Sequence, residues 1–64
     1  MRTLKQVFDS LVKSYNNQET VNFIDVRDLD ELLKDSDLVK SLIDTYNNNE
    51  QINFFHLRDL EKLI

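Results

Sequence analysis

The strongest constraint on the fold is an internal repeat with an offset of 31 residues. Residues 11–33 align with residues 42–64, and 11 of the 23 aligned pairs are identical. This agreement indicates a duplicated supersecondary unit. A unit of this size is too small to bury its apolar face alone. We therefore expect two repeats, about 3–34 and 35–64, to pack on each other as a single domain over 1–64.

The apolar spacing predicts two helices in each repeat. The residues before the first loop follow the spacing i, i+3, i+4, i+7, i+8 and i+11: Leu4, Val7, Phe8, Leu11, Val12 and Tyr15. The final helix of each repeat is carried by Val26, Leu29, Leu32 and Leu33, or by Leu57, Leu60, Leu63 and Ile64. Thr3 and Gln6 form a capping box, and Asn22 and Asn53 are placed to cap the later helices. These patterns predict an all-α fold of four short helices.

The loop of each repeat is rich in asparagine. The chain has no glycine, and asparagine tolerates the left-handed backbone that glycine usually supplies at the end of a helix. The alternation in 21–23 and 52–54 suits two or three extended residues, which allow a minimal two-stranded antiparallel β bridge across the repeat axis. In this arrangement we expect Phe23 and Phe54 to point inward.

Composition excludes several classes of site. The 64 residues contain no Cys, Gly or Pro, so disulfides, zinc-thiolate sites, iron–sulfur clusters and glycine-rich phosphate loops are absent. His56 is the only histidine, and we expect it to be a solvated residue at the start of the last helix. No nucleophile–base pair or cofactor motif is present. We therefore expect neither enzymatic activity nor a cofactor or metal.

Two helix-loop-helix units with polar loops resemble a pair of EF-hands joined through their loops. Placing Val21 and Ile52 at the central apolar position of each loop makes the ligand positions Ser14, Asn16, Gln18 and Asp25, and Thr45, Asn47, Asn49 and His56. This resemblance implies the paired architecture, and it would imply calcium-dependent regulation. The chain departs from the pattern because one carboxylate occupies these eight positions and Glu19 and Glu50 replace the glycine of the turn.

The charge balance of the chain limits the classes of binding partner that we expect. The net charge is −4, and all of the excess lies in residues 25–37. Nucleic acids and anionic membranes attract clustered Lys and Arg, so we expect neither to bind directly. No apolar run approaches a membrane span and no signal region begins the chain, so a cytoplasmic location is the expectation. We expect a monomer or a weak homodimer, and the asparagine-rich, alanine-free composition fits a low-GC bacterium or its phage.

The candidate recognition residues lie on the second helix of the first repeat, which charge differences between the repeats, such as Glu31 against Lys62, make the acidic one. Asp28, Glu31 and Asp35 form an acidic ridge at helical spacing, with Ile24 beside it as an apolar anchor. We expect Phe55, and Ile24 with it, either to staple the entry of its helix or to be exposed as an apolar contact. We expect a non-enzymatic interaction module, an adaptor or inhibitor that docks on a larger protein with a basic surface. The alternatives are a calcium-responsive regulator and an acidic mimic of DNA.

Overall fold

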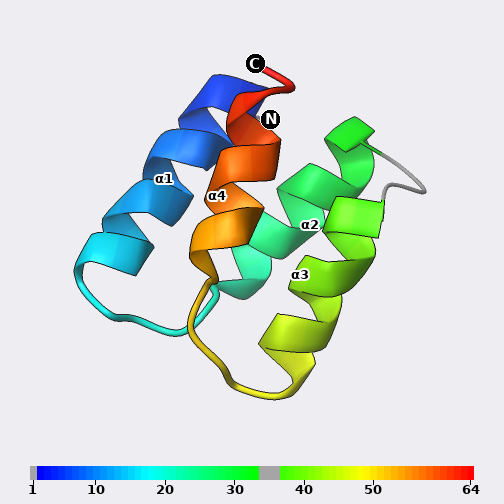
Figure 1. The fold of residues 1–64 in the computed structure, drawn as a ribbon. Coiled ribbons are helices and arrows are strands. Elements are labelled where there is room, and N and C mark those ends of the chain that lie inside the picture. Colours follow the sequence, from blue (N-terminus) through cyan, green and yellow to red (C-terminus); the bar gives the residue numbers. More distant parts are fainter. Residues whose placement is uncertain (1, 34–36) are drawn as a thin grey trace.

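The computed structural model describes residues 2–33 and 37–64, and within them the chain is all-helical without a sheet. The helices are α1 (Leu4–Asn16), α2 (Phe23–Leu33), α3 (Asp37–Asn47) and α4 (Phe54–Glu61). The predicted fold class is therefore confirmed. The two loops lie at one end of the bundle, and the chain ends lie at the other (Figure 1).

The two loops meet in one antiparallel β bridge, between Thr20 and Gln51. The backbone N–H of Val21 donates to the carbonyl oxygen of Glu50 over 3.3 Å. Thr20 and Gln51 are equivalent in the repeat, so the bridge lies on the pseudo-twofold axis. The predicted bridge is present, one residue earlier than the expected segments.

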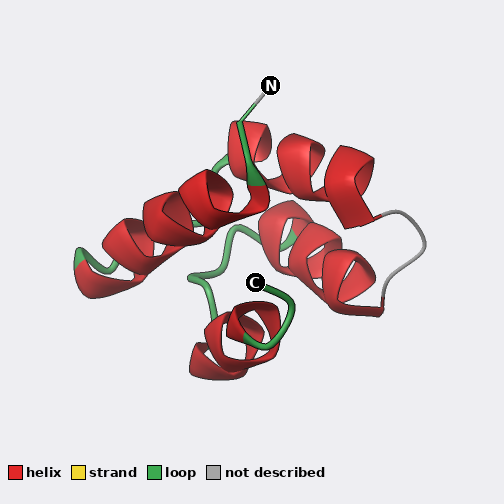
Figure 2. Cartoon of the chain, turned by 90° about the horizontal axis from the view of Figure 1, so that it is seen from above, coloured by secondary structure: helices red, strands yellow, loops and turns green. Residues whose placement is uncertain are grey.

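Each helix packs on two others, so the four form a ring. Helix α1 contacts α2 and α4, and α3 contacts the same two helices. Figure 2 shows this arrangement from above. The contacts of α2 with α3 and of α1 with α4 join the two repeats into one core.

The core consists of ten buried apolar residues drawn from all four helices and both loops: Val7, Leu11, Val21, Val26, Leu29, Val39, Leu42, Ile52, Leu57 and Leu60. Eight of them form four equivalent pairs of the repeat. Val21 and Ile52 supply the loop residues of the core, which explains why both loops are held close to the bundle axis.

The helix ends confirm most of the predicted caps. Thr3 Oγ1 accepts from the backbone N–H of Gln6, and Gln6 Oε1 accepts from that of Thr3. The Asn22 and Asn53 side chains each accept a backbone N–H two residues later, at 2.7 Å. These bonds satisfy donors that the first turn of a helix leaves unpaired.

The ends of α1 and α3 are Schellman motifs. In the first, Gln18 N–H donates to the Tyr15 carbonyl and Glu19 N–H donates to that of Ser14. The left-handed residue is Asn49 in the second loop, as predicted for asparagine, but Gln18 in the first, each with φ of 57°. The position is therefore set by the motif, and asparagine is not required at it.

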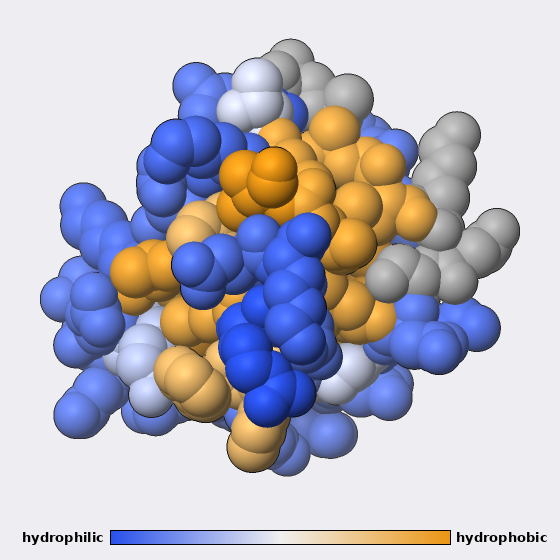
Figure 3. All heavy atoms as spheres, turned by 45° about the horizontal axis from the view of Figure 1, so that its top comes forward, coloured by the Kyte–Doolittle hydropathy of each residue, from blue (hydrophilic) through white to orange (hydrophobic). Residues whose placement is uncertain are grey.

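Two expectations about apolar side chains are wrong. Phe23 and Phe54 are more than half exposed, because Val21 and Ile52 already fill the core at this level. Leu63 and Ile64 lie beyond the end of α4 and are exposed by more than half as well. Figure 3, which brings the end of the bundle with the chain termini forward, shows a continuous apolar area there.

No helix among the described residues combines the length and the apolar character needed to cross a bilayer.

Candidate functional site

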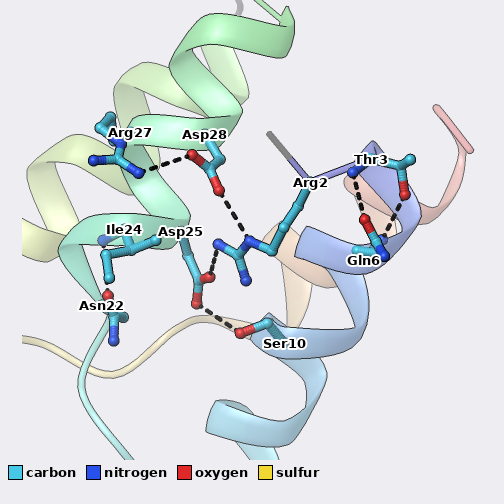
Figure 4. A network of polar contacts seen from close by, with 9 residues as sticks. All are labelled: Arg2, Thr3, Gln6, Ser10, Asn22, Ile24, Asp25, Arg27 and Asp28. Carbon is cyan, nitrogen blue, oxygen red and sulfur yellow. Dashed lines mark hydrogen bonds and ion pairs between the residues drawn. The ribbon is translucent and has the colours of Figure 1, made fainter.

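Helix α2 carries two buried carboxylates, Asp25 and Asp28, that pair with Arg2. Arg2 Nη2 lies 2.6 Å from Asp25 Oδ1, and Arg2 Nε lies 2.9 Å from Asp28 Oδ2. Ser10 of α1 donates its hydroxyl to the other oxygen of Asp25 over 3.1 Å. Figure 4 shows these side chains converging from the start of the chain, α1 and α2. The network therefore joins α1, and Arg2 before it, to α2.

The attraction between the charged Arg2 guanidinium and the two carboxylates stabilises this network. The hydrogen bond from Arg2 lowers the pKa of Asp28, although desolvation opposes the shift. The hydrogen bonds to Asp25 and Asp28 raise the pKa of Arg2 further above its ordinary value. Both carboxylate side chains are less than a tenth exposed, at 3% and 6%. A buried carboxylate needs such a partner, because burial of an unpaired charge is costly.

The predicted exposed ridge is therefore corrected at Asp28. Its side chain bonds to Arg2 and, at 3.5 Å, to Arg27, so it stabilises the fold and presents little charge to solvent. Ile24 is half exposed and Glu31 is exposed, as expected. Asp35 lies outside the described residues.

An open groove brings three of the predicted residues together. It measures about 600 Å³, and its walls combine the start of the chain with α1 and α2: Arg2, Gln6, Ile24, Arg27, Asp28 and Glu31. Ile24 and Glu31 supply an apolar and an acidic contact on its α2 side. We call this the α1–α2 groove.

A second groove lies on the other side of α2, against α3. It measures about 360 Å³ and is mostly apolar; its walls are Phe23, Val26, Arg27, Asp30, Ile43, Tyr46 and Asn47. The ring centroids of Phe23 and Tyr46 are 5.8 Å apart. We call this the α2–α3 groove. Arg27 borders both grooves, so α2 separates them.

Phe55 lies on α4 and borders neither groove. It is the repeat counterpart of Ile24 and is more than half exposed. Its ring contacts Phe54 edge-on at 6.0 Å, and the Arg58 guanidinium lies 4.8 Å from its centroid. The structure thus separates Phe55 from the residues on α2, although both helices present an apolar residue at this position.

His56 was wrongly expected to be solvated. It is partly buried, its Nε2 lies 2.6 Å from Ser41 Oγ, and its Nδ1 accepts the backbone N–H of Asn53. In the neutral ring the proton is therefore on Nε2, which donates to Ser41. Burial lowers the pKa of His56, and the charge of Asp59 opposes that shift.

Sequence reasoning missed Arg2, Ser10 and Ser41 as site residues. The two serines carried a usable signal, because Ser10 and Ser41 are identical at the repeat offset and extend the aligned region by one position. Arg2 carried none, because its repeat counterpart is Leu33.

Within residues 2–33 and 37–64, no three His, Asp or Glu side chains gather where they could hold a metal ion. Two of the ligand positions that the EF-hand resemblance implies, Ser14 and Asn16, belong to α1. Comparison of the chain with protein-family models, curated proteins and solved structures gives no match.

Proposed function

We propose that this protein is a non-enzymatic interaction module that docks on a larger, basic protein through the exposed surface of α2. One observation carries the proposal: Ile24 stands half exposed beside Glu31 on an open groove, over a carboxylate network that holds the helix in place. Exposed apolar side chains framed by charge are typical of protein contact sites.

The rigidity of α2 supports this proposal. The Arg2 bonds to Asp25 and Asp28 fix the helix against α1, and its apolar side packs into the core through Val26 and Leu29. A contact surface on a fixed helix loses little conformational freedom on binding, which favours affinity.

The buried carboxylates also favour an interaction module over a mimic of DNA. Asp25 and Asp28 are half of the acidic residues that α2 contributes, and Arg2 neutralises part of their charge. The remaining exposed acids of α2 are Asp30 and Glu31. Two charges make a poor imitation of a phosphate backbone, which carries one charge per ~1.7 Å of duplex.

The calcium-responsive alternative has a direct test. Thermal unfolding in millimolar calcium and in chelator should give the same midpoint, because the loops offer few carboxylates. A rise of several degrees with calcium would favour the alternative.

The proposed function is tested by affinity capture from the source host followed by mass spectrometry. We compare the intact protein with Ile24→Ser/Glu31→Lys on α2 and with Phe55→Ser/Glu61→Lys on α4, which makes the same types of change. All four side chains are exposed, so we expect both variants to fold.

The α2 variant should lose a protein that the intact chain captures, and the α4 variant should retain it. The surface is assigned wrongly if the α4 variant alone loses that protein. The proposal fails as a whole if both variants retain every protein that the intact chain captures.

A further inference from the structure

The α2–α3 groove has the dimensions of an anchor site. Its volume of about 360 Å³ lies near the lower end of the range of about 300–1,000 Å³ for ligand pockets. Phe23, Val26, Ile43 and Tyr46 form its apolar walls. These features fit one or two large apolar side chains.

The exposed charge differs between the two helices that form this groove and the other two helices. The exposed residues of α2 and α3 include four acids and two bases, whereas those of α1 and α4 include three of each sign. Asp25 and Asp28 of α2 are buried and paired with Arg2, so they add little to the charge that a partner meets. An excess of two exposed acids therefore remains on the two helices that form the groove, and its own walls include one acid, Asp30, and one base, Arg27.

We propose that the α2–α3 groove receives one large apolar side chain of a partner segment, and that lysine or arginine residues flank that side chain. This inference rests on the proposed function and names a second contact of the same helix. The apolar anchor would bury against Phe23 and Tyr46, where a desolvated aromatic contact contributes most of the affinity of an interface. The flanking cations would be drawn to α2 and α3, which mainly speeds association.

The duplication supplies an internal control for this site. Tyr15, Val12 and Phe54 are the repeat counterparts of Tyr46, Ile43 and Phe23. They lie on the α1–α4 side, where the helices have no acidic excess. The same apolar residue types thus occur in two charge environments within one molecule.

Binding is tested with defined synthetic peptides and the full chain. The probe is a fluorescein-labelled peptide with a central Phe flanked by Lys on both sides. One control peptide has Ala in place of Phe, and the other has Glu in place of Lys. Fluorescence anisotropy gives affinities, and amide chemical shifts locate the contact.

We expect the Phe/Lys peptide to bind about tenfold more tightly than the Ala control, which corresponds to about 1.4 kcal/mol. The Glu peptide should not bind at the same concentrations. Amide shifts should concentrate at α2 and α3. Equal binding of the Phe and Ala peptides, or shifts concentrated at α1 and α4, would overturn the inference.

Matched protein variants sharpen the result. Tyr46→Ala should weaken the Phe/Lys peptide about fivefold or more, whereas Tyr15→Ala should leave its affinity within about twofold. Asp30→Lys should weaken it and reduce its salt dependence, whereas Glu61→Lys should have less effect. Circular dichroism confirms that each variant keeps the fold. Equal losses in the matched variants would contradict the assignment.

A second copy of this chain is the competing occupant. Sedimentation of the free protein that shows a dimer, dissociated by Tyr46→Ala and unaffected by Tyr15→Ala, would overturn the proposal of a cationic segment. A monomer with intact peptide binding supports it.

The host capture experiment separates this inference from the proposed function. A host protein that Ile24→Ser/Glu31→Lys loses and Tyr46→Ala retains would overturn the groove assignment and leave the proposed function standing. Loss of that protein in both variants supports the two together.

Discussion

Asp25 of α2 and His56 of α4 occupy the same position in the two repeats, and each contacts the serine at the equivalent position of the preceding helix. In the first repeat the contact is part of an ionic network with Arg2. In the second it is a contact between a partly buried imidazole and a hydroxyl. The two repeats therefore share the position of this contact between their helices. The first repeat makes it with an ionic network, and the second with an imidazole and a hydroxyl.

The comparison also separates packing from surface function. The core pairs Leu11/Leu42 and Leu29/Leu60 are identical and fully or almost fully buried in both repeats. Glu31 and Lys62, which differ in charge, are both exposed. Packing constrains both repeats alike, so the divergent exposed positions are the better candidates for recognition.

The largest expected effect tests whether the two repeats contribute equally to the core. Leu29→Ala and Leu60→Ala each remove a side chain with no exposed surface, and each should cost about 2–5 kcal/mol of unfolding free energy. Urea denaturation measures both. The costs should agree within about 1 kcal/mol, the scale on which local relaxation differs. A much larger difference would show that the repeats do not contribute equally to one core.

The next-largest effect compares the ionic contact of Asp25 with the neutral contact of His56. Asp25→Ala should cost about 1.5–3 kcal/mol, because it removes charge-assisted hydrogen bonds to Arg2 and Ser10. His56→Ala should cost less, because it removes hydrogen bonds that involve no charged group. Urea denaturation of both variants and of Arg2→Ala/Asp25→Ala gives the values. The double variant should cost less than the sum of its single changes, and strict additivity would show that Arg2 and Asp25 are not coupled.

The stability that His56 contributes and the stability that Asp28 contributes depend on pH in different ranges. The folded pKa of His56 is below its ordinary value of 6.5, so the unfolded chain binds more protons there and stability falls as pH drops through 6.5. The folded pKa of Asp28 is below 3.8, so its contribution is present above 3.8 and is lost as pH falls further. Melting temperature measured from pH 8 to pH 2 should therefore decline in two separate ranges.

His56→Gln is the matched control for the upper range. The chain has one histidine, so this variant should lose the decline that begins as pH falls through 6.5 and keep the acidic one. If the variant retains the upper decline, His56 is not its source.

The smallest expected effect compares the two left-handed loop positions. Gln18→Gly removes the side-chain clash at φ of 57° and should stabilise the fold by about 0.5–1 kcal/mol. Asn49→Gly should gain less, since asparagine tolerates this backbone better. Thermal unfolding of the two variants measures the difference. An equal or reversed order would show that the side chains at these positions make contacts beyond the backbone geometry.

Much of the fold could be predicted from local pattern. The spacing of Leu4, Val7 and Leu11 predicted α1, and Thr3 with Gln6 predicted its start, because both depend on residues within one or two helical turns. The repeat predicted that a second helical pair would follow and that the loops would meet near the axis. Ile24 and Glu31 were predicted as exposed candidates for the same reason, since neither continues the apolar stripe.

Residues far apart in the chain decided the rest. Asp28 has the sequence context of an exposed acid, and only the approach of Arg2 from 26 positions away makes it a buried, paired one. Equivalent positions of α1 and α3 are also buried to different extents. Val7 is fully buried in α1, whereas the equivalent Leu38 of α3 is only partly buried. The repeating pattern by itself determined that two helical pairs share one core. Tertiary packing decided which carboxylates face solvent, because burial of a charge depends on a partner that the local sequence does not contain.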